Sequence, residues 1–221
     1  MFRIKICGIT NVSDALAAAE AGADAIGLNF YEKSRRFVDQ KTAQQIVAAL
    51  PSELLKVGVF VNHNQRSIES TASAVGLDAI QLHGDEQSAF IAVLAKNRKV
   101  LRALRCTPDI NSRLIHFVQA CKQSGRLPDA FLLDADAGAE YGGTGERADW
   151  GLIAHACESL SEVPLVLAGG LTPTNVAAGI TAVRPAAVDV ASGVESSPGK
   201  KDHAKLRDFI AAARDAFDKT S

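Results

Sequence analysis

The stretch Gly22-Ala-Asp-Ala-Ile-Gly-Leu28 carries the pattern that decides the fold, because it returns along the chain. Close counterparts are Gly76–Leu82 and Leu127–Leu133, and a looser one is Arg184–Val190. The third positions of these stretches are residues 24, 78, 129 and 186, which are 54, 51 and 57 apart. Each interval has room for a helix, a further strand and a second helix, so the repeating unit is a βαβα quarter.

Strand-like and helix-like segments alternate through the whole sequence. The predicted strands are residues 4–7, 22–28, 55–61, 77–82, 100–105, 130–133, 163–167 and 187–191. The predicted helices are residues 12–20, 39–50, 65–75, 86–97, 109–122, a helix from about 149, 173–183 and 202–217. An open doubly wound sheet rarely has four similar quarters, so we predict an α/β fold of the single (β/α)8 TIM barrel type. The whole chain, residues 1–221, is expected to form one catalytic domain.

Composition excludes several classes of function. The net charge is -1 and no run of Lys and Arg is present, so a nucleic-acid partner is not expected. No apolar run approaches the roughly 18 residues of a membrane span, so no membrane partner is expected. The four cysteines form no C-x-x-C motif and have no zinc-finger spacing to histidine, which predicts reduced thiols, no metal site and a cytoplasmic protein.

The repeat also predicts which side chains face the barrel interior. Ile26, Leu28, Ile80 and Leu82 are expected to face the helices, because side chains alternate along a strand. The uppermost inward positions are then Asn29, His83, Asp134 and Ala191, and the layer below holds Gly27, Gln81, Leu132 and Asp189. Polar residues therefore gather at the C-terminal ends of the strands, where barrel enzymes place their chemistry.

Two loops have the composition of an anion site. Gly169 and Gly170 follow the seventh predicted strand, and Ser192 and Gly193 follow the eighth. Barrels frequently bind phosphate with these two loops, using backbone N–H groups that glycine leaves accessible. A short extra helix is expected to begin near Glu195. The glycine-rich run Tyr141–Gly145 is interpreted as a loop that covers the site or contributes to phosphate binding.

Cys7 and Asp134 are the candidate catalytic residues. Cys7 shares a strand face with Lys5 and precedes Gly8, and a nearby charge can favour its thiolate as a base. The alternative is a buried cysteine that acts as a small hydrophobe. Asp134 closes the sixth strand after three apolar residues, which can raise its pKa and keep it protonated as a general acid. The alternative is a helix N-cap or loop aspartate.

Other polar candidates keep a structural alternative. Arg36 is interpreted as a solvated loop arginine by default. It becomes a candidate binding residue if the substrate carries a carboxylate, which a guanidinium binds well. Asp189 could be a buried structural acid, and Gln81 and His83 could be satisfied polar residues at the barrel mouth.

Motifs along nearly the whole chain resemble those of the phosphoribosylanthranilate isomerases. They are Lys5-Ile-Cys-Gly-Ile-Thr10, Ser34-Arg-Arg36, Val57–Asn62, Gln81-Leu-His-Gly-Asp85, Leu133-Asp134, Tyr141–Gly145, Ala168–Pro173 and Asp189–Glu195. The resemblance implies the Amadori rearrangement of N-(5-phosphoribosyl)anthranilate to 1-(o-carboxyphenylamino)-1-deoxyribulose 5-phosphate in tryptophan biosynthesis, without cofactor or metal.

The resemblance also implies roles for individual residues. Cys7 is then the general base, Asp134 the general acid and Arg36 the contact to the anthranilate carboxylate. Gly169, Gly170, Ser192 and Gly193 lie in the matching phosphate loops, while Gln81, His83 and Asp189 line the pocket. Lys5 is interpreted as electrostatic support for the thiolate.

Two rival functions stay open at this point. One is a phosphosugar isomerase barrel of histidine biosynthesis, in which an inward aspartate usually replaces Cys7. The other is a barrel that binds a phosphosugar without catalysis. The expected partner is a small phosphorylated substrate, and the chain is expected to be a monomer or a homodimer.

Overall fold

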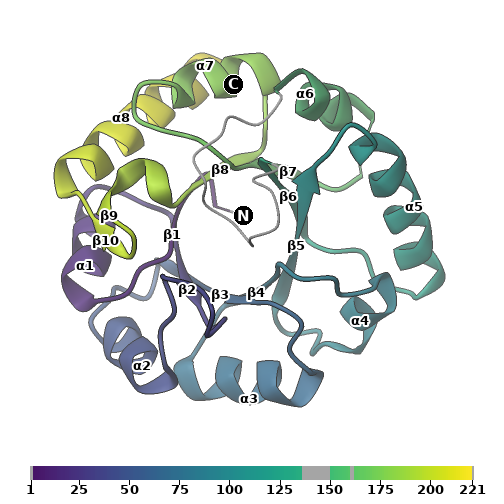
Figure 1. Ribbon diagram of the computed structural model, residues 1–221, viewed down its shortest axis with the longest axis horizontal. Coiled ribbons are helices and arrows are strands. Elements are labelled where there is room, and N and C mark those ends of the chain that lie inside the picture. Colours follow the sequence, from purple (N-terminus) through teal and green to yellow (C-terminus); the bar gives the residue numbers. More distant parts are fainter. Residues whose placement is uncertain (1, 136–149, 160–161, 221) are drawn as a thin grey trace.

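The structure is a computed structural model that describes residues 2–135, 150–159 and 162–220. Eight parallel strands close into a barrel in sequence order, and helices surround it (Figure 1). The barrel strands are β1 (Ile4–Cys7), β2 (Ala25–Asn29), β3 (Leu55–Phe60), β4 (Ala79–Leu82), β5 (Lys99–Cys106), β6 (Ala130–Ala135), β7 (Leu165–Leu167) and β8 (Ala187–Val190). The helices are α1 (Val12–Glu20), α2 (Gln40–Ala48), α3 (Gln65–Val75), α4 (Ser88–Val93), α5 (Ile110–Gln123), α6 (Trp150–Ser159), α7 (Val176–Val183) and α8 (His203–Thr220). The predicted fold class is confirmed.

The aspartate of the repeat has a structural explanation. Asp24 Oδ2 accepts hydrogen bonds from the backbone N–H groups of Arg3 and Ile4, at 3.0 and 2.8 Å. Asp78 Oδ2 accepts from Lys56 N at 2.8 Å, and Asp129 Oδ2 accepts from Val100 N at 2.9 Å. Each aspartate precedes an even-numbered strand and satisfies a donor at the start of the strand before it. The repeat therefore ties neighbouring strands in register at the bottom of the barrel.

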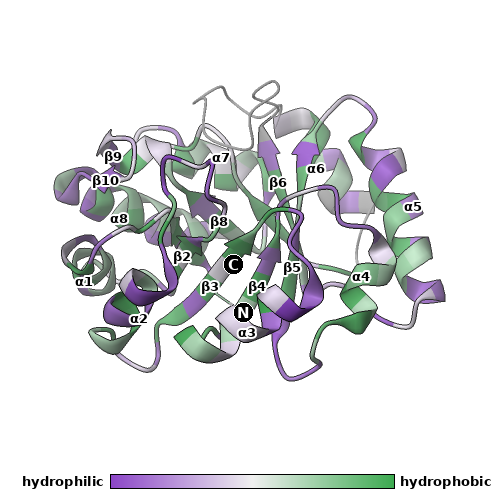
Figure 2. Cartoon of the chain, turned by 60° about the horizontal axis from the view of Figure 1, so that its bottom comes forward, coloured by the Kyte–Doolittle hydropathy of each residue, from purple (hydrophilic) through white to green (hydrophobic). Residues whose placement is uncertain are grey.

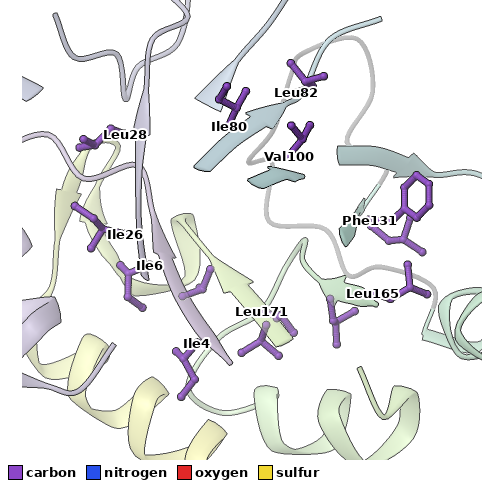
Figure 3. Packing of buried hydrophobic residues seen from close by; sticks show 14 of the residues in the cluster. Ile4, Ile6, Ile26, Leu28, Ile80, Leu82, Val100, Phe131, Leu165 and Leu171 are labelled. Atoms are coloured by element: carbon purple, nitrogen blue, oxygen red, sulfur yellow. The ribbon is translucent and has the colours of Figure 1, made fainter. Parts of the chain in front are cut away.

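Two apolar layers fill the molecule. Alternate strand residues, including Ile26, Leu28, Ile80 and Leu82, pack against the helices as predicted (Figure 3). The opposite residues form a second cluster inside the barrel, whose members include Phe2, Val57, Leu101, Leu132 and Val166. Hydrophobic colour dominates the strands in Figure 2, while polar segments recur along the outer helices. A barrel filled in this way leaves only its two ends for function.

Two predicted helices begin later than expected. The helix predicted at residues 86–97 is shorter, since α4 spans only Ser88–Val93. Glu86 stays outside the helix because its carboxylate accepts from the backbone N–H groups of Asn62 and Gly84 and pairs with Arg102. The helix predicted at residues 173–183 begins only at Val176. The Asn175 side chain accepts from Thr172 N at 2.8 Å, which holds residues 172–175 in a turn before the helix.

The segment after β8 contains structure that the sequence pattern did not predict. A short 3₁₀ helix, η1, spans Ser192–Val194, and an antiparallel hairpin follows with β9 (Glu195–Ser197) and β10 (Lys200–Lys201). The short extra helix thus begins at Ser192 instead of near Glu195. Tyr141–Gly145 lies outside the described residues. In the part of the chain that is described, no helix combines the length and apolarity needed to cross a bilayer.

Candidate functional site

The predicted site residues gather at the C-terminal end of the barrel. Cys7 is the last residue of β1, Asp134 is the penultimate residue of β6, and His83 directly follows β4. Figure 1 places β1 and β6 on opposite sides of the ring, so a base and an acid on these strands approach a ligand from two sides. Arg36 reaches the same end from the loop between β2 and α2, where its hydrogen bonds to Glu195 are the main cause that raises its pKa and the nearby Cys7 and Asp134 add to the increase.

Cys7 sits within a buried charge cluster. Lys5 Nζ donates to Asp189 Oδ1 at 2.7 Å, and the lysine side chain is fully buried. Burial is the main cause that raises the pKa of the Cys7 thiol; Lys5 and Lys201 oppose the increase, and Asp189 adds to it. The charge of Lys5 therefore opposes the increase in the pKa of Cys7, which is the expected direction, but Lys5 is also hydrogen-bonded to Asp189. Asp189 is a partner of Lys5 in the barrel interior.

His83 is a neutral side chain beside the candidate acid. Burial, with the nearby cations Lys5, Arg102 and Arg105, lowers the pKa of His83 to about 4. Gln81 Nε2 lies 3.2 Å from His83 Nδ1, and an amide N–H donates, so Nδ1 accepts and Nε2 carries the proton. His83 Nε2 lies 3.7 Å from Asp134 Oδ2. The neutral ring thus presents an N–H toward the Asp134 carboxyl.

The surroundings of Asp134 differ from those inferred from its sequence neighbours. Phe131 and Leu133 face the helix layer, so they do not surround the carboxyl. The carboxyl faces the barrel mouth with His83, and Arg36 lies near enough to interact with its charge. These two residues therefore form no apolar pocket around the carboxyl, and the role of Asp134 as general acid stays a prediction.

Arg36 is held in a fixed orientation. Its Nε donates to Glu195 Oε1 and its Nη2 to Glu195 Oε2, both at 2.7 Å, and its side chain is only 13% exposed. The interpretation of Arg36 as a solvated loop residue is therefore wrong. Gly8 makes room for it, because a Cβ at this position would lie 2.4 Å from Arg36 Cδ. The Nη1 group is the part of the fork that Glu195 does not use, and it can bind a carboxylate.

The two glycine loops lie against each other at the same end. Gly169 and Gly170 have positive φ angles of 83° and 65°, which favour glycine. A Cβ on Gly193 would lie 1.8 Å from the Leu171 carbonyl oxygen, so the loops touch through their backbones. Asn175 Nδ2 donates to Gly170 O at 2.9 Å and fixes the first loop. Close loop packing, as well as ligand access, thus requires glycine at position 193.

Sequence reasoning missed three residues near the site. The sequence pattern did not single out Lys201, whose side chain is fully buried and whose Nζ donates to Cys7 O at 2.7 Å. Glu195 stood out only as part of a motif and as the expected start of a short helix, and its carboxylate binds both Arg36 and Lys201. Arg105 stands opposite Asp134 in the register of β5 and β6. The Pro198-Gly199 pair between Glu195 and Lys201 was the signal for the hairpin.

The arrangement suits proton transfer to a phosphorylated ligand. A thiol, a carboxyl and a guanidinium lie at the same end of the barrel as the two glycine loops. Within the described residues no group of three or more His, Cys, Asp or Glu side chains is arranged to hold a metal ion.

Comparisons with known proteins agree over nearly the whole length. The family model for N-(5'phosphoribosyl)anthranilate (PRA) isomerase matches residues 4–212. The isomerase of Pseudomonas fluorescens Pf0-1 is 48% identical over 212 residues, which cover 96% of this chain and 98% of that protein. The isomerase of Geobacter sp. M21 is 44% identical over 218 residues, which cover 97% and 98%.

Solved structures give the same result. The crystal structure of phosphoribosyl anthranilate isomerase from Thermotoga maritima has a TM-score of 0.85 and 40% identity, covering 97% of this chain and 100% of that one. Another isomerase structure, in complex with reduced 1-(o-carboxyphenylamino)-1-deoxyribulose 5-phosphate, has a TM-score of 0.82 and 39% identity over the same shares. The chain therefore belongs to the N-(5'-phosphoribosyl)anthranilate isomerase family.

Proposed function

We propose that Cys7 and Asp134 carry out the two proton transfers by which this isomerase rearranges N-(5'-phosphoribosyl)anthranilate. The isomerase activity in tryptophan biosynthesis follows from family membership. The observation that supports the two roles is the position of a half-buried thiol at the end of β1 and a carboxyl near the end of β6, across the same barrel mouth. General acid and base groups of this kind typically contribute about 10²–10⁴-fold each.

The acid step comes first in the proposed mechanism. Asp134 gives a proton to the ring oxygen of the furanose, the C1–O bond breaks, and the nitrogen lone pair forms the C1=N bond of a protonated Schiff base. The His83 N–H beside Asp134 stabilises the carboxylate that this transfer leaves behind. The product of the step is an open-chain cation whose C2 proton has become acidic.

The base step then uses Cys7. Its Sγ takes the C2 proton, and the electron pair of the C–H bond moves to form an enolamine, which tautomerises to the C2 ketone. Burial raises the pKa of Cys7. The positive charge of the Schiff base favours the thiolate, so we expect the thiol to release its own proton to solvent water after the ring has opened and before Sγ takes the C2 proton.

Substrate binding is assigned to the remaining site residues. Arg36 binds the anthranilate carboxylate with the part of its guanidinium that Glu195 leaves available. The phosphate binds to backbone N–H groups of the loops that contain Gly169, Gly170, Ser192 and Gly193. Asp189 and Gln81 support the site from the layer below, Asp189 through Lys5 and Gln81 through His83.

Single substitutions test the two catalytic roles. We expect Cys7→Ala and Asp134→Ala each to reduce kcat by at least 10²-fold, measured by the loss of substrate fluorescence, with little change in the affinity for a reduced product analogue. Cys121→Ala, in α5, and Asp208→Asn, on the exposed face of α8, are the matched controls. Turnover near that of the native protein in either test variant would show that the assigned role is wrong.

The setting of the enzyme is also a proposal. Residues 1–221 act as one catalytic domain in the cytoplasm and need no cofactor. The Thermotoga maritima relative is described as dimeric, so this chain is proposed to be a homodimer or a monomer. Light scattering at several protein concentrations distinguishes the two.

A further inference from the structure

Lys201 links three separate parts of the site through one buried ammonium group. Its Nζ donates to Cys7 O at 2.7 Å, to Ala191 O at 3.0 Å and to Glu195 Oε1 at 3.0 Å. An ammonium has three N–H donors, so these contacts use all of them. The three partners are the peptide that follows the candidate base, the residue that opens the second phosphate loop, and the carboxylate that holds Arg36.

The charges alternate in sign from Lys201 through Glu195 to Arg36. Lys201 is paired with Glu195, and Glu195 accepts two hydrogen bonds at 2.7 Å from Arg36. The three side chains together carry one net positive charge, which a single substrate carboxylate neutralises. Without Lys201 the pair of Glu195 and Arg36 is electrically neutral, and its attraction for an anion falls.

The hairpin does not depend on the ammonium to keep its shape. Lys201 N donates to Asp14 Oδ2 at 2.9 Å, and Asp202 N donates to Val194 O at 2.9 Å. Removing a lysine from water is costly, and an apolar side chain of similar size fills such a position at lower cost. The three contacts to site residues are therefore the feature that calls for a lysine here.

We propose that Lys201 and Glu195 are positioning residues that together set Arg36 for the substrate carboxylate and hold the end of β1 on which Cys7 stands. This inference rests on the proposed role of Arg36 as the carboxylate contact. It predicts that the two residues control the preference for anthranilate over an amine that has no carboxylate.

The test compares two substrates, phosphoribosyl anthranilate and the phosphoribosyl aniline made from aniline and ribose 5-phosphate. The measured quantity is the ratio of their kcat/KM values. We expect K201M, through the lost positive charge, and E195Q, through the lost orientation of Arg36, each to lower this ratio about tenfold or more, as for loss of a hydrogen bond to a charged group. K200M is the matched control, since Lys200 is the exposed neighbour on the same hairpin, and its ratio is expected to stay unchanged.

A second measurement follows the thiol directly. Because the Lys201 charge lowers the pKa of Cys7, alkylation of Cys7 by iodoacetamide in K201M is expected to need a higher pH than in the native protein. Peptide mass spectrometry separates Cys7 from the other cysteines. If K201M does not fold, the double variant K201M/E195Q takes the place of K201M in both assays, because it removes both charges of the buried pair.

The outcomes separate this inference from the proposed function. Ratios within twofold of the native value in folded K201M and E195Q, while R36M collapses the ratio, would overturn the positioning role and leave Arg36 as the carboxylate contact. An unchanged ratio in R36M itself would overturn the assignment of Arg36. An unshifted alkylation profile in K201M would show that Lys201 does not act on Cys7.

Discussion

Gly27→Ala is the sharpest single test of how the barrel places its candidate base. Gly27 pairs with Cys7 in the register of β1 and β2. A Cβ at this position would lie 2.6 Å from Cys7 Sγ, 3.1 Å from Cys7 Cα and 3.2 Å from Lys5 Cε. Ordinary contacts begin at 3.4 Å, so the thiol must retreat by about an ångström.

The strands have little freedom to absorb this change. The Gly27 carbonyl accepts hydrogen bonds at 3.0 Å from the backbone N–H groups of both Gly8 and Ile9, which tie the turn after Cys7 to β2. A displacement of about 1 Å at a reacting group costs on the order of 10²-fold in kcat. Overpacking costs about 1–3 kcal/mol of stability, or very roughly 2–12 °C in Tm for a chain of this size.

The assay is steady-state loss of substrate fluorescence together with a thermal melt. Gly58→Ala is the control, because its Cβ would lie 2.4 Å from Leu77 Cδ1 in the helix-facing layer, away from the site. We expect both variants to lose stability, but only Gly27→Ala to lose about 10²-fold in kcat. A kcat within threefold of the native value in Gly27→Ala, or an equal loss in Gly58→Ala, would show that the space at Gly27 does not set the position of Cys7.

Three further predictions concern other parts of the barrel. The pKa of His83 in the folded protein, about 4, lies below its ordinary value of 6.5, so the unfolded chain binds more protons and stability falls as the pH drops from 6.5 toward 4. In urea denaturation we expect the free energy of unfolding to fall by about 2 kcal/mol between pH 7 and pH 5, and His83→Asn to remove this fall. Gly193→Ala pushes the Leu171 carbonyl away and should weaken competitive inhibition by ribose 5-phosphate about tenfold, while an unchanged inhibition constant would contradict the phosphate assignment. Ala79→Val partly fills the cavity of about 110 Å³ at the N-terminal end of the barrel, so denaturation should show a gain of about 0.5–1 kcal/mol with kcat unchanged, and a fall in kcat would show coupling between the two ends.

Local patterns predict strands and helices well where one physical rule dominates. Helices α1 and α3 have the predicted bounds, because the side chains of Asn11 and Asn64 cap them as local hydrogen-bond acceptors. The rule fails where a distant partner competes with the helix. Glu86 is the example, since its carboxylate is bound by groups of other strands and loops and the helix starts after it.

The barrel is encoded in recurring local patterns, because side chains alternate along each predicted strand in all four quarters and an aspartate precedes the second strand of the first three. These patterns also determined which strand ends meet, and thereby the candidates Cys7, His83 and Asp134. The electrostatics of the site depend on contacts that form only in the folded barrel. Lys5 with Asp189, and Arg36 with Glu195 and Lys201, are pairs of residues more than 150 positions apart, or on opposite strands of an unpredicted hairpin. Their charges become coupled only when the closed barrel removes water between them, since burial strengthens ionic interactions that local sequence cannot encode.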